Sequence, residues 1–404
     1  MSLSIFRSLS IKNYRLFFIG QGLSLTGSWM QTIALGWLVY RLTHSALMLG
    51  TVGFASAIWS FVLGPLGGMV ADRYDKRTII IITQALMMVQ ALLLTMLTLT
   101  GTITIPWIIA LGIAGGLCGV FEMPARQAWM WELVGDKTLL PNAIALNSFI
   151  FNGARLIGPA LAGVVVAAGG EGICFLINSL SFMAVLIMLF LIKTAALSPL
   201  STSGLSALVR LRQGFAYAFK HPAIRSMLLL VAIISLVGIS YGVLMPVFAR
   251  DILHGSPRTL GFLMGSAGIG ALLAALLLAE RPDARHLPRF AAFGPLLLGG
   301  GLIAFSFSRN TLLSCIILGI VGFGQLLQMA SSNTLLQAIV PDDKRGLVMS
   351  IYGMCFLGMM PLGSLMLGSL AQSFGAPLTT GICGLICVMA PFVFFKKILT
   401  ITAT

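Results

Sequence analysis

Residues 78–99 read TIIIITQALMMVQALLLTMLTL and contain no charged side chain. About 20 apolar residues in an α-helix cross the hydrocarbon core of a bilayer, so this stretch predicts a transmembrane helix. The whole chain has the same character, since 58% of its 404 residues are hydrophobic, 9% are charged and the mean hydropathy is +1.01. Soluble domains carry about 25% charged residues. We therefore exclude a soluble protein and expect an all-α polytopic membrane protein.

Twelve apolar windows of this kind follow one another along the chain, and we expect each to cross the membrane. The first follows three basic residues without a small-residue cleavage site, which favours a retained helix over a signal peptide. The predicted spans are 16–40, 46–70, 78–99, 104–131, 141–168, 172–193, 223–248, 257–279, 289–308, 311–338, 346–371 and 376–395.

Basic residues are distributed unevenly among the connections. Of the 25 Lys and Arg residues, 20 lie before the first span, in or at the edges of the even-numbered connections, or after the last span; Arg126, near the end of the fourth predicted span, is counted among them. Four lie at the odd-numbered connections, and one, Arg155, lies inside the fifth span. Because Lys and Arg concentrate on the cytoplasmic side of membrane proteins, we expect both termini in the cytoplasm.

The longest polar connection divides the chain into two six-helix halves. We expect an N-terminal bundle at 1–193, a cytoplasmic linker at 194–222 and a C-terminal bundle at 223–404. Apolar linker residues recur at helical spacing beside basic ones, which predicts an amphipathic helix on the cytoplasmic surface. It is either a plain linker or a lipid-sensing element. These apolar residues are Leu205, Leu208, Leu211, Phe215 and Phe219.

An internal repeat indicates that the two halves are equivalent. A three-glycine pattern in the fifth span recurs in the eleventh at a constant offset of 205, and Leu49-Gly50 recurs as Leu260-Gly261 at an offset of 211. Parallel six-helix repeats with a substrate site near the bilayer midplane between them are a transporter architecture, so we expect two pseudo-symmetric bundles. The glycines are Gly153, Gly158 and Gly163, then Gly358, Gly363 and Gly368.

The connection after the second span reads GMVADRYDKR, residues 68–77. It resembles the G-x-x-x-D-[RK]-x-G-[RK]-[RK] motif of the major facilitator superfamily. Asp75 replaces the usual glycine, as in the branch of enterobactin-exporter-like efflux proteins. The resemblance implies a conformational latch between helices 2, 3 and 11; the alternative is a basic loop that only fixes topology. The matching residues are Gly68, Asp72, Arg73, Lys76 and Arg77.

The fifth span contains Gly153, Gly158, Pro159 and Gly163 and is similar to the Gly-Pro motif of antiporters in that superfamily. Its spacing departs from the fullest form of the motif, which lacks an arginine. Pro159 removes a backbone hydrogen bond, and the glycines let a neighbouring helix approach. Arg155 lies about 21 Å from the cytoplasmic end of this helix. An arginine at that depth predicts a substrate or proton-coupling role; a structural ion pair is the alternative.

Glu122 is the one acid well inside a predicted span. A carboxyl there can carry a proton, and rearrangement of Arg126 or Arg155 would change how readily it does so. We therefore expect proton coupling through these three residues. The alternative is a permanent Glu122–Arg126 pair at i, i+4.

By the repeat offsets, Glu122 corresponds to Gln328 and Arg155 to Met360, so the charged groups belong to the N-terminal half. Scattered polar residues inside the spans predict a polar substrate pocket, although each alone is explained by an interhelical hydrogen bond. With Arg155, the candidates are Gln21, Ser24, Trp29, Gln31, Asn147, Asn152, Tyr241, Gln325, Gln328 and Tyr352.

These observations favour a secondary active exporter that works by proton antiport and alternating access. Interior arginines outnumber the acid, which favours a carboxylate-bearing or other anionic substrate. A siderophore also fits the branch resemblance. A multidrug exporter for neutral or anionic amphipathic compounds and a lysophospholipid transporter are the alternatives. We expect a monomer in the bacterial cytoplasmic (inner) membrane, with a small-molecule substrate, protons and the bilayer as partners.

Other function classes lack the residues that they need. The four histidines fall in predicted connections, and the six cysteines lie in apolar stretches without disulfide or zinc spacing. No G-x-x-x-x-G-K-[ST] loop appears, which excludes ATP hydrolysis by this chain. The basic residues punctuate apolar segments instead of forming a patch. We therefore expect no enzyme activity, no metal or cofactor and no nucleic-acid partner.

Overall fold

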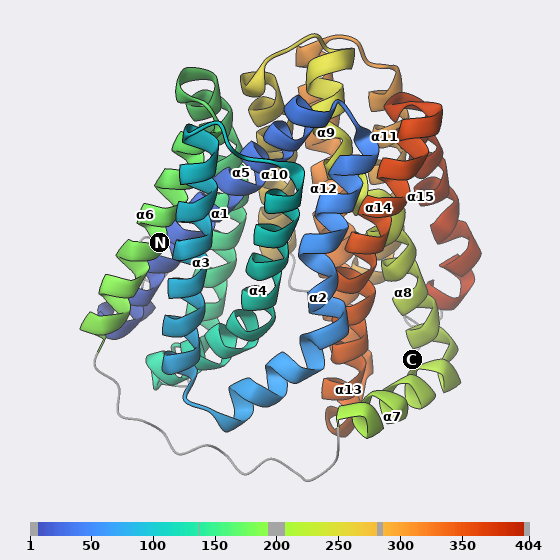
Figure 1. Ribbon diagram of the computed structural model, residues 1–404. Coiled ribbons are helices and arrows are strands. Elements are labelled where there is room, and N and C mark those ends of the chain that lie inside the picture. The colour runs from blue at the N-terminus through green and yellow to red at the C-terminus, as the bar shows by residue number, and fades with distance from the viewer. Residues whose placement is uncertain (1–6, 137, 193–206, 281–285, 400–404) are drawn as a thin grey trace. The chain divides into compact units, whose positions relative to one another are not determined.

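The computed structural model describes residues 7–136, 138–192, 207–280 and 286–399. These residues form helices and connections, with no β-strand among them (Figure 1). The helices are α1 (Lys12–Thr43), α2 (Ala46–Arg73), α3 (Lys76–Leu99), α4 (Ile105–Val134), α5 (Leu140–Gly169), α6 (Glu171–Leu191), α7 (Ala207–Lys220), α8 (Pro222–Ile233), α9 (Met245–Val247), α10 (Pro257–Glu280), α11 (Leu287–Phe307), α12 (Thr311–Ile339), α13 (Asp342–Gly353), α14 (Met359–Phe374) and α15 (Ala376–Leu399).

Within the described residues, 11 helices are long and apolar enough to cross a membrane. The prediction of an all-α polytopic protein is confirmed to that extent. The first predicted span forms the 32-residue helix α1 but is not among the 11. Polar residues such as Gln21, Ser24 and Gln31 dilute its apolar character. The number of twelve spans and the orientation of the termini stay predictions.

Two predicted spans are irregular helices. The seventh covers Pro222–Ile252 and contains π-helical turns at Ile234–Ile239 and Phe248–Ile252 with a 3₁₀ turn at Ser240–Leu244 between them. The eleventh joins α13 to α14 through a π-helical turn at Met354–Gly358. Such turns inside long helices are rare and occur frequently at functional sites.

The chain divides into two compact units. One contains residues 1–38 and 62–204, and the other contains residues 39–61 and 205–404. The grouping places residues 39–61 with the C-terminal part of the chain. The division into bundles 1–193 and 223–404 stays a prediction. Within the predicted linker, residues 207–220 form the helix α7, while residues 194–206 lie outside the described part. The place of this helix on the cytoplasmic surface stays a prediction.

The core of the first unit lies where α1, α4 and α5 meet. The Tyr14 hydroxyl donates to the Ala143 carbonyl over 2.9 Å, and the Phe17 and Trp129 rings make an edge contact at 5.8 Å. Tyr14 and Trp129 are each 1% exposed. The polar tip of Tyr14 is therefore satisfied within an otherwise apolar cluster.

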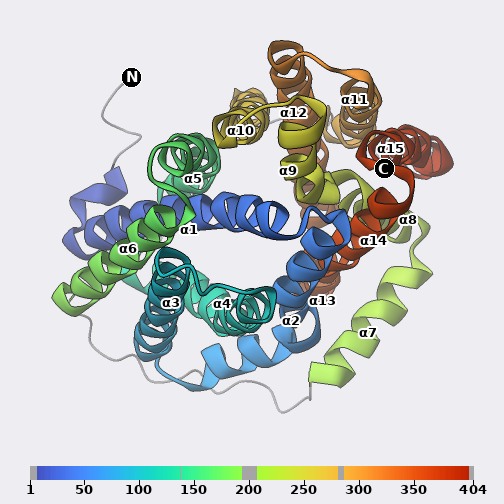
Figure 2. The same cartoon turned by 45° about the horizontal axis from the view of Figure 1, so that its top comes forward.

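In the second unit α12 packs against both α10 and α11, and α15 packs against α11 (Figure 2). Glycines permit this packing. A Cβ on Gly299 of α11 would lie 2.5 Å from the carbonyl oxygen of Gly384 on α15, and the reciprocal distance is 2.6 Å. Small residues at these crossings let the backbones approach closely, as in other membrane helix pairs.

The predicted repeat corresponds to matching contacts in the two units. A Cβ on Gly158 of α5 would lie 2.5 Å from Trp29 Cβ and 3.0 Å from the carbonyl oxygen of Thr26, both on α1. A Cβ on Gly363 of α14 would lie 2.0 Å from the carbonyl oxygen of Leu236, in the seventh predicted span. In each repeat the second glycine of the pattern therefore lies against the repeat's first helix.

Candidate functional site

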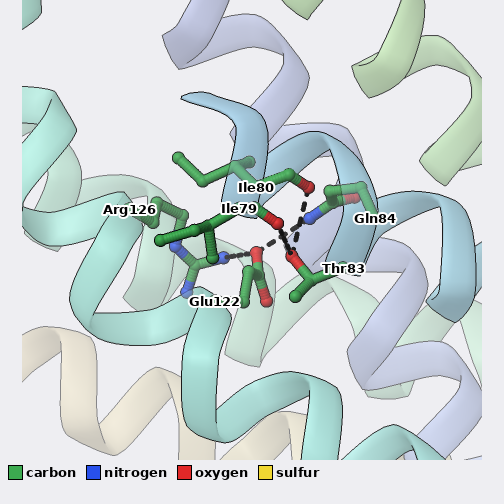
Figure 3. A network of polar contacts seen from close by, with 6 residues as sticks. All are labelled: Ile79, Ile80, Thr83, Gln84, Glu122 and Arg126. Atoms are coloured by element: carbon green, nitrogen blue, oxygen red, sulfur yellow. Dashed lines mark hydrogen bonds and ion pairs between the residues drawn. The ribbon is translucent and has the colours of Figure 1, made fainter. Parts of the chain in front are cut away.

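Glu122 lies on α4 and is 6% exposed. Two donors share its Oε1 atom: Arg126 Nη1 at 2.9 Å and Gln84 Nε2 at 2.8 Å (Figure 3). Arg126 is one turn further along α4, whereas Gln84 comes from α3. The i, i+4 pair, which the sequence offered as the structural alternative to proton coupling, is therefore present, and a neutral amide from a second helix completes it. Whether the pair is permanent stays a prediction.

Gln84 is the residue of this site that sequence reasoning missed. It is 2% exposed, and α3 carries it about 12 Å from the start of the helix at Lys76. The hydroxyl of the neighbouring Thr83 donates to the carbonyls of Ile79 and Ile80 in its own helix (Figure 3). Gln84 is therefore the residue that bonds to α4. The position of Gln84 inside the uncharged run 78–99 could have indicated this contact, because an amide at that depth in the membrane needs a hydrogen-bond partner.

Gln84 and Arg126 also border a small cavity in the first unit, together with Gln21 of α1. No described residue donates to Gln84 Oε1, which is buried. Arg126 therefore faces both the carboxylate of Glu122 and this cavity.

Arg155 lies half-buried on α5. Its predicted proton-coupling and substrate roles, and its pairing with Glu122, stay predictions. The pair that the structure gives directly is Glu122 with Arg126.

The predicted pocket residues of the first unit divide by their partners. Gln31 donates to Gln90 Oε1 over 3.2 Å and accepts from Asn178 Nδ2 over 2.8 Å, so its amide braces α1 against α3 and α6. Asn152 donates to the Ser148 carbonyl of its own helix over 2.9 Å. The remaining members are buried or half-buried: Gln21, Ser24, Trp29 and Asn147.

The predicted pocket residues of the second unit are all buried. Gln328 donates to Ser332 Oγ over 3.2 Å, so the Glu122–Arg126 pair corresponds by the repeat to a neutral i, i+4 pair. Tyr352 donates to the Met329 carbonyl over 3.1 Å. Tyr241 and Gln325 complete this set. Because the predicted pocket draws on both units, it stays a prediction as a whole.

The motif between α2 and α3 is built into helix ends. Asp75 accepts hydrogen bonds from Thr78 N at 2.8 Å and Thr78 Oγ1 at 2.6 Å, so it caps the start of α3. The residue that replaces the family's glycine is thus an N-cap. Lys76 pairs with Glu132 of α4 at 2.7 Å, and Arg77 donates to the Leu189 carbonyl of α6 at 2.9 Å.

The other motif residues differ in their surroundings. Asp72 and Arg73 are exposed at the end of α2, and a Cβ on Gly68 would meet nothing within 4 Å. Gly153 is equally open, whereas Gly158, Pro159 and Gly163 are buried. The predicted latch between helices 2, 3 and 11 stays a prediction.

Comparisons with known proteins identify the family. The transmembrane secretion effector family matches residues 3–403. The staphyloferrin A transporter of Staphylococcus aureus is 30% identical over 94% of this chain and 96% of its own length. The enterobactin exporter of Citrobacter koseri is 24% identical over 84% and 80%, and the multidrug efflux pump Tap of Mycolicibacterium fortuitum is 24% identical over 87% and 88%.

Solved structures show the same fold. A peptide transporter of the POT family superimposes with a TM-score of 0.79 at 12% identity, over 97% of this chain and 95% of that chain. A POT family transporter in complex with 5-aminolevulinic acid superimposes with a TM-score of 0.76 at 12% identity, over 96% of each chain. The chain is thus a multi-pass membrane transporter and not an enzyme, and it belongs to the transmembrane secretion effector family of the major facilitator superfamily transporters.

Proposed function

We propose that this chain is a proton-coupled exporter of a siderophore or another carboxylate-bearing small molecule in the bacterial cytoplasmic membrane. It works as a monomer by alternating access, with the halves 1–193 and 223–404 moving against each other. The observation that carries the proposal is the buried carboxylate of Glu122 with Arg126 and Gln84. Intramembrane acids mark proton pathways in many transporters.

The Glu122 site has the groups that proton coupling requires. The carboxylate of Glu122 is buried and is held by one guanidinium and one amide, so a proton taken up there changes the charge balance of the site. One proton crossing a potential of about 100 mV supplies about 2.3 kcal/mol, which sustains a roughly fifty-fold substrate gradient. The corresponding Gln328–Ser332 pair of the second unit is neutral, so coupling through Glu122 uses one proton.

An anionic chelator is the substrate class that the chain's chemistry and relatives favour. Arg155 and Arg126 put two guanidinium groups on predicted spans against one acid, and guanidinium groups bind carboxylates in bidentate geometry. Two relatives are a staphyloferrin A transporter and an enterobactin exporter.

The multidrug efflux pump Tap, which is 24% identical, supports a second candidate. In that case the substrates are neutral or anionic amphipathic compounds. Lysophospholipid transport is a further alternative, and the same assay separates all three.

The test is uptake into everted membrane vesicles with an acidic interior, because export from the cell becomes uptake in that geometry. The substrate panel contains carboxylate siderophores, catecholate siderophores, small carboxylates, cationic dyes and a labelled lysophospholipid. We expect gradient-driven uptake of an anionic chelator by the wild type. Glu122→Gln should abolish that uptake but retain substrate exchange at equal pH, because the transport cycle itself remains intact.

Glu280→Gln is the matched control, since Glu280 ends α10 and is exposed. It should transport like the wild type. Uptake of dyes alone would replace the siderophore assignment by drug efflux. Uptake of a chelator that persists in Glu122→Gln would overturn the assignment of the proton site.

A further inference from the structure

The small cavity beside Gln84 lies among the first-unit helices α1, α3, α4 and α6. Its volume is about 10 Å³, which is room for one water molecule. Most of its lining is apolar. The lining residues are Leu16, Phe17, Gly20, Gln21, Ile80, Gln84, Arg126, Val185, Met188, Leu189 and Ile192.

Three polar side chains interrupt this apolar lining: Gln21, Gln84 and Arg126. Gln84 Nε2 donates one of its two N–H groups to Glu122, whereas its buried Oε1 receives no hydrogen bond from the described residues. Gln21 is 6% exposed. A buried acceptor without a donor is unfavourable, so an acceptor, an amide and a guanidinium around a space of this size indicate a polar occupant.

We propose that this cavity binds one water molecule, which donates to Gln84 Oε1, accepts from the Arg126 guanidinium and contacts the Gln21 amide. Buried waters typically make about three hydrogen bonds, and these three side chains supply them. The proposal gives Gln21 and Gln84 a role in hydration of the Glu122–Arg126 pair, in place of a direct contact between Gln21 and substrate.

The consequence for coupling rests on the proposed function of Glu122. When Glu122 takes up a proton, the carboxyl group becomes neutral and the nearby guanidinium loses its counter-charge. A buried charge without a partner is strongly unfavourable. The water is a second acceptor for Arg126 at that moment, so it permits protonation while Arg126 stays charged and in place.

Glycine at position 20 makes room for the cavity. A Cβ on Gly20 would lie 3.0 Å from the Sδ atom of Met188, and both residues line the cavity. Gly22 is two positions further along α1, and its Cβ would meet only Ile150 at 3.8 Å, an ordinary contact. Gly20→Ala therefore places a methyl group at the cavity, and Gly22→Ala is the matched control on the same helix.

The water can be detected without any transport measurement. Pulsed X-ray radiolysis converts bound water into hydroxyl radicals, which oxidise the nearest side chain, and the sulfur of Met188 is the reporter. Met87, a similarly half-buried methionine on α3 outside the cavity, is the reference. We expect Met188 to be oxidised faster than Met87 in the wild type and in Gly22→Ala. The excess should be lost in Gly20→Ala.

Gln21→Leu removes one partner of the water without filling the space, and it should also reduce the excess oxidation of Met188. It serves as the second variant if Gly20→Ala does not fold. Equal oxidation of Met188 and Met87 in the wild type, or an excess that survives both substitutions, would overturn the water site. If the water is present but Glu122→Gln transports with full proton dependence, the water site stands and the proposed coupling through Glu122 fails.

Discussion

Tyr40, near the end of α1, donates a hydrogen bond to the carboxylate of Asp251, 211 positions further along the chain. Both residues belong to the second unit. Ser45 donates to Gln372 over 2.9 Å in the same region, so residues 39–61 are held by the C-terminal part of the chain. An alternating-access cycle needs contacts between its two sequence halves that form in one state and break in the other. In the alternating-access cycle proposed above, we expect these contacts to take that role.

Removal of the Tyr40 hydroxyl should favour the state in which these contacts are broken. A hydrogen bond to a charged group contributes about 1.5–3 kcal/mol. Tyr40→Phe should therefore raise the population of molecules in which these contacts are broken about tenfold or more. The rate at which a cysteine introduced at Ser364 is alkylated, in a variant with the native cysteines replaced, measures this population, because Ser364 lies against Gly50 and Gly53 and is covered while the contacts hold. Tyr74→Phe, at an exposed tyrosine, is the control. An unchanged alkylation rate would mean that the bond does not stabilise this state.

A larger side chain at Gly50 should sterically prevent the close packing of α2 against α14. A Cβ on Gly50 would lie 2.5 Å from the Ser364 carbonyl oxygen and 3.1 Å from Gly368 Cα, so Gly50→Leu cannot be accommodated without separation of α2 from α14. We expect loss of substrate transport with normal membrane insertion and raised alkylation at Ser364. Gly64→Leu on the same helix should be tolerated, because a Cβ there meets nothing within 4 Å. Full transport by Gly50→Leu would show that this contact is not needed in the cycle.

The Glu122–Arg126 pair should contribute to the stability of the folded protein as well as to transport. Arg126→Met leaves Glu122 buried beside Gln84 alone, and the loss of one partner of a buried ion pair costs about 3–5 kcal/mol. The double variant with Glu122→Gln should recover most of this loss, because no charge remains unpaired. Thermal unfolding in detergent, followed by tryptophan fluorescence, measures both. If Arg126→Met unfolds like the wild type, the Glu122–Arg126 pair does not stabilise the folded protein.

Most of the long helices could be predicted from the sequence because each follows from an apolar run of about membrane length, whereas α7 followed from amphipathic spacing. The irregular turns at Ile234–Ile239 and Met354–Gly358 could not, since both lie within uniformly apolar runs. The repeat of Gly158 as Gly363 was visible as spacing, and the structure adds that each glycine meets the first helix of its repeat.

The charged centre was only partly predictable. The i, i+4 spacing of Glu122 and Arg126 indicated their pairing, because a helix brings such residues together. The Gln84 contact depends on how α3 and α4 face each other, which no local pattern encodes. Tyr40 with Asp251 was missed for the same reason, since the two residues are far apart in the sequence and end different helices.

Asp75 gives a prediction about the motif itself, because it stands where the family motif has glycine and its side chain caps α3. Loss of an N-cap side chain to alanine costs about 1 kcal/mol, whereas glycine at the same place costs only a few tenths. Asp75→Ala should therefore lower the unfolding temperature more than Asp75→Gly does. Both should retain the Lys76–Glu132 pair and transport, because the cap sets the helix start and not the ion pair. Equal effects of the two substitutions, or loss of transport in Asp75→Gly, would instead give the Asp75 carboxylate a direct part in the conformational cycle.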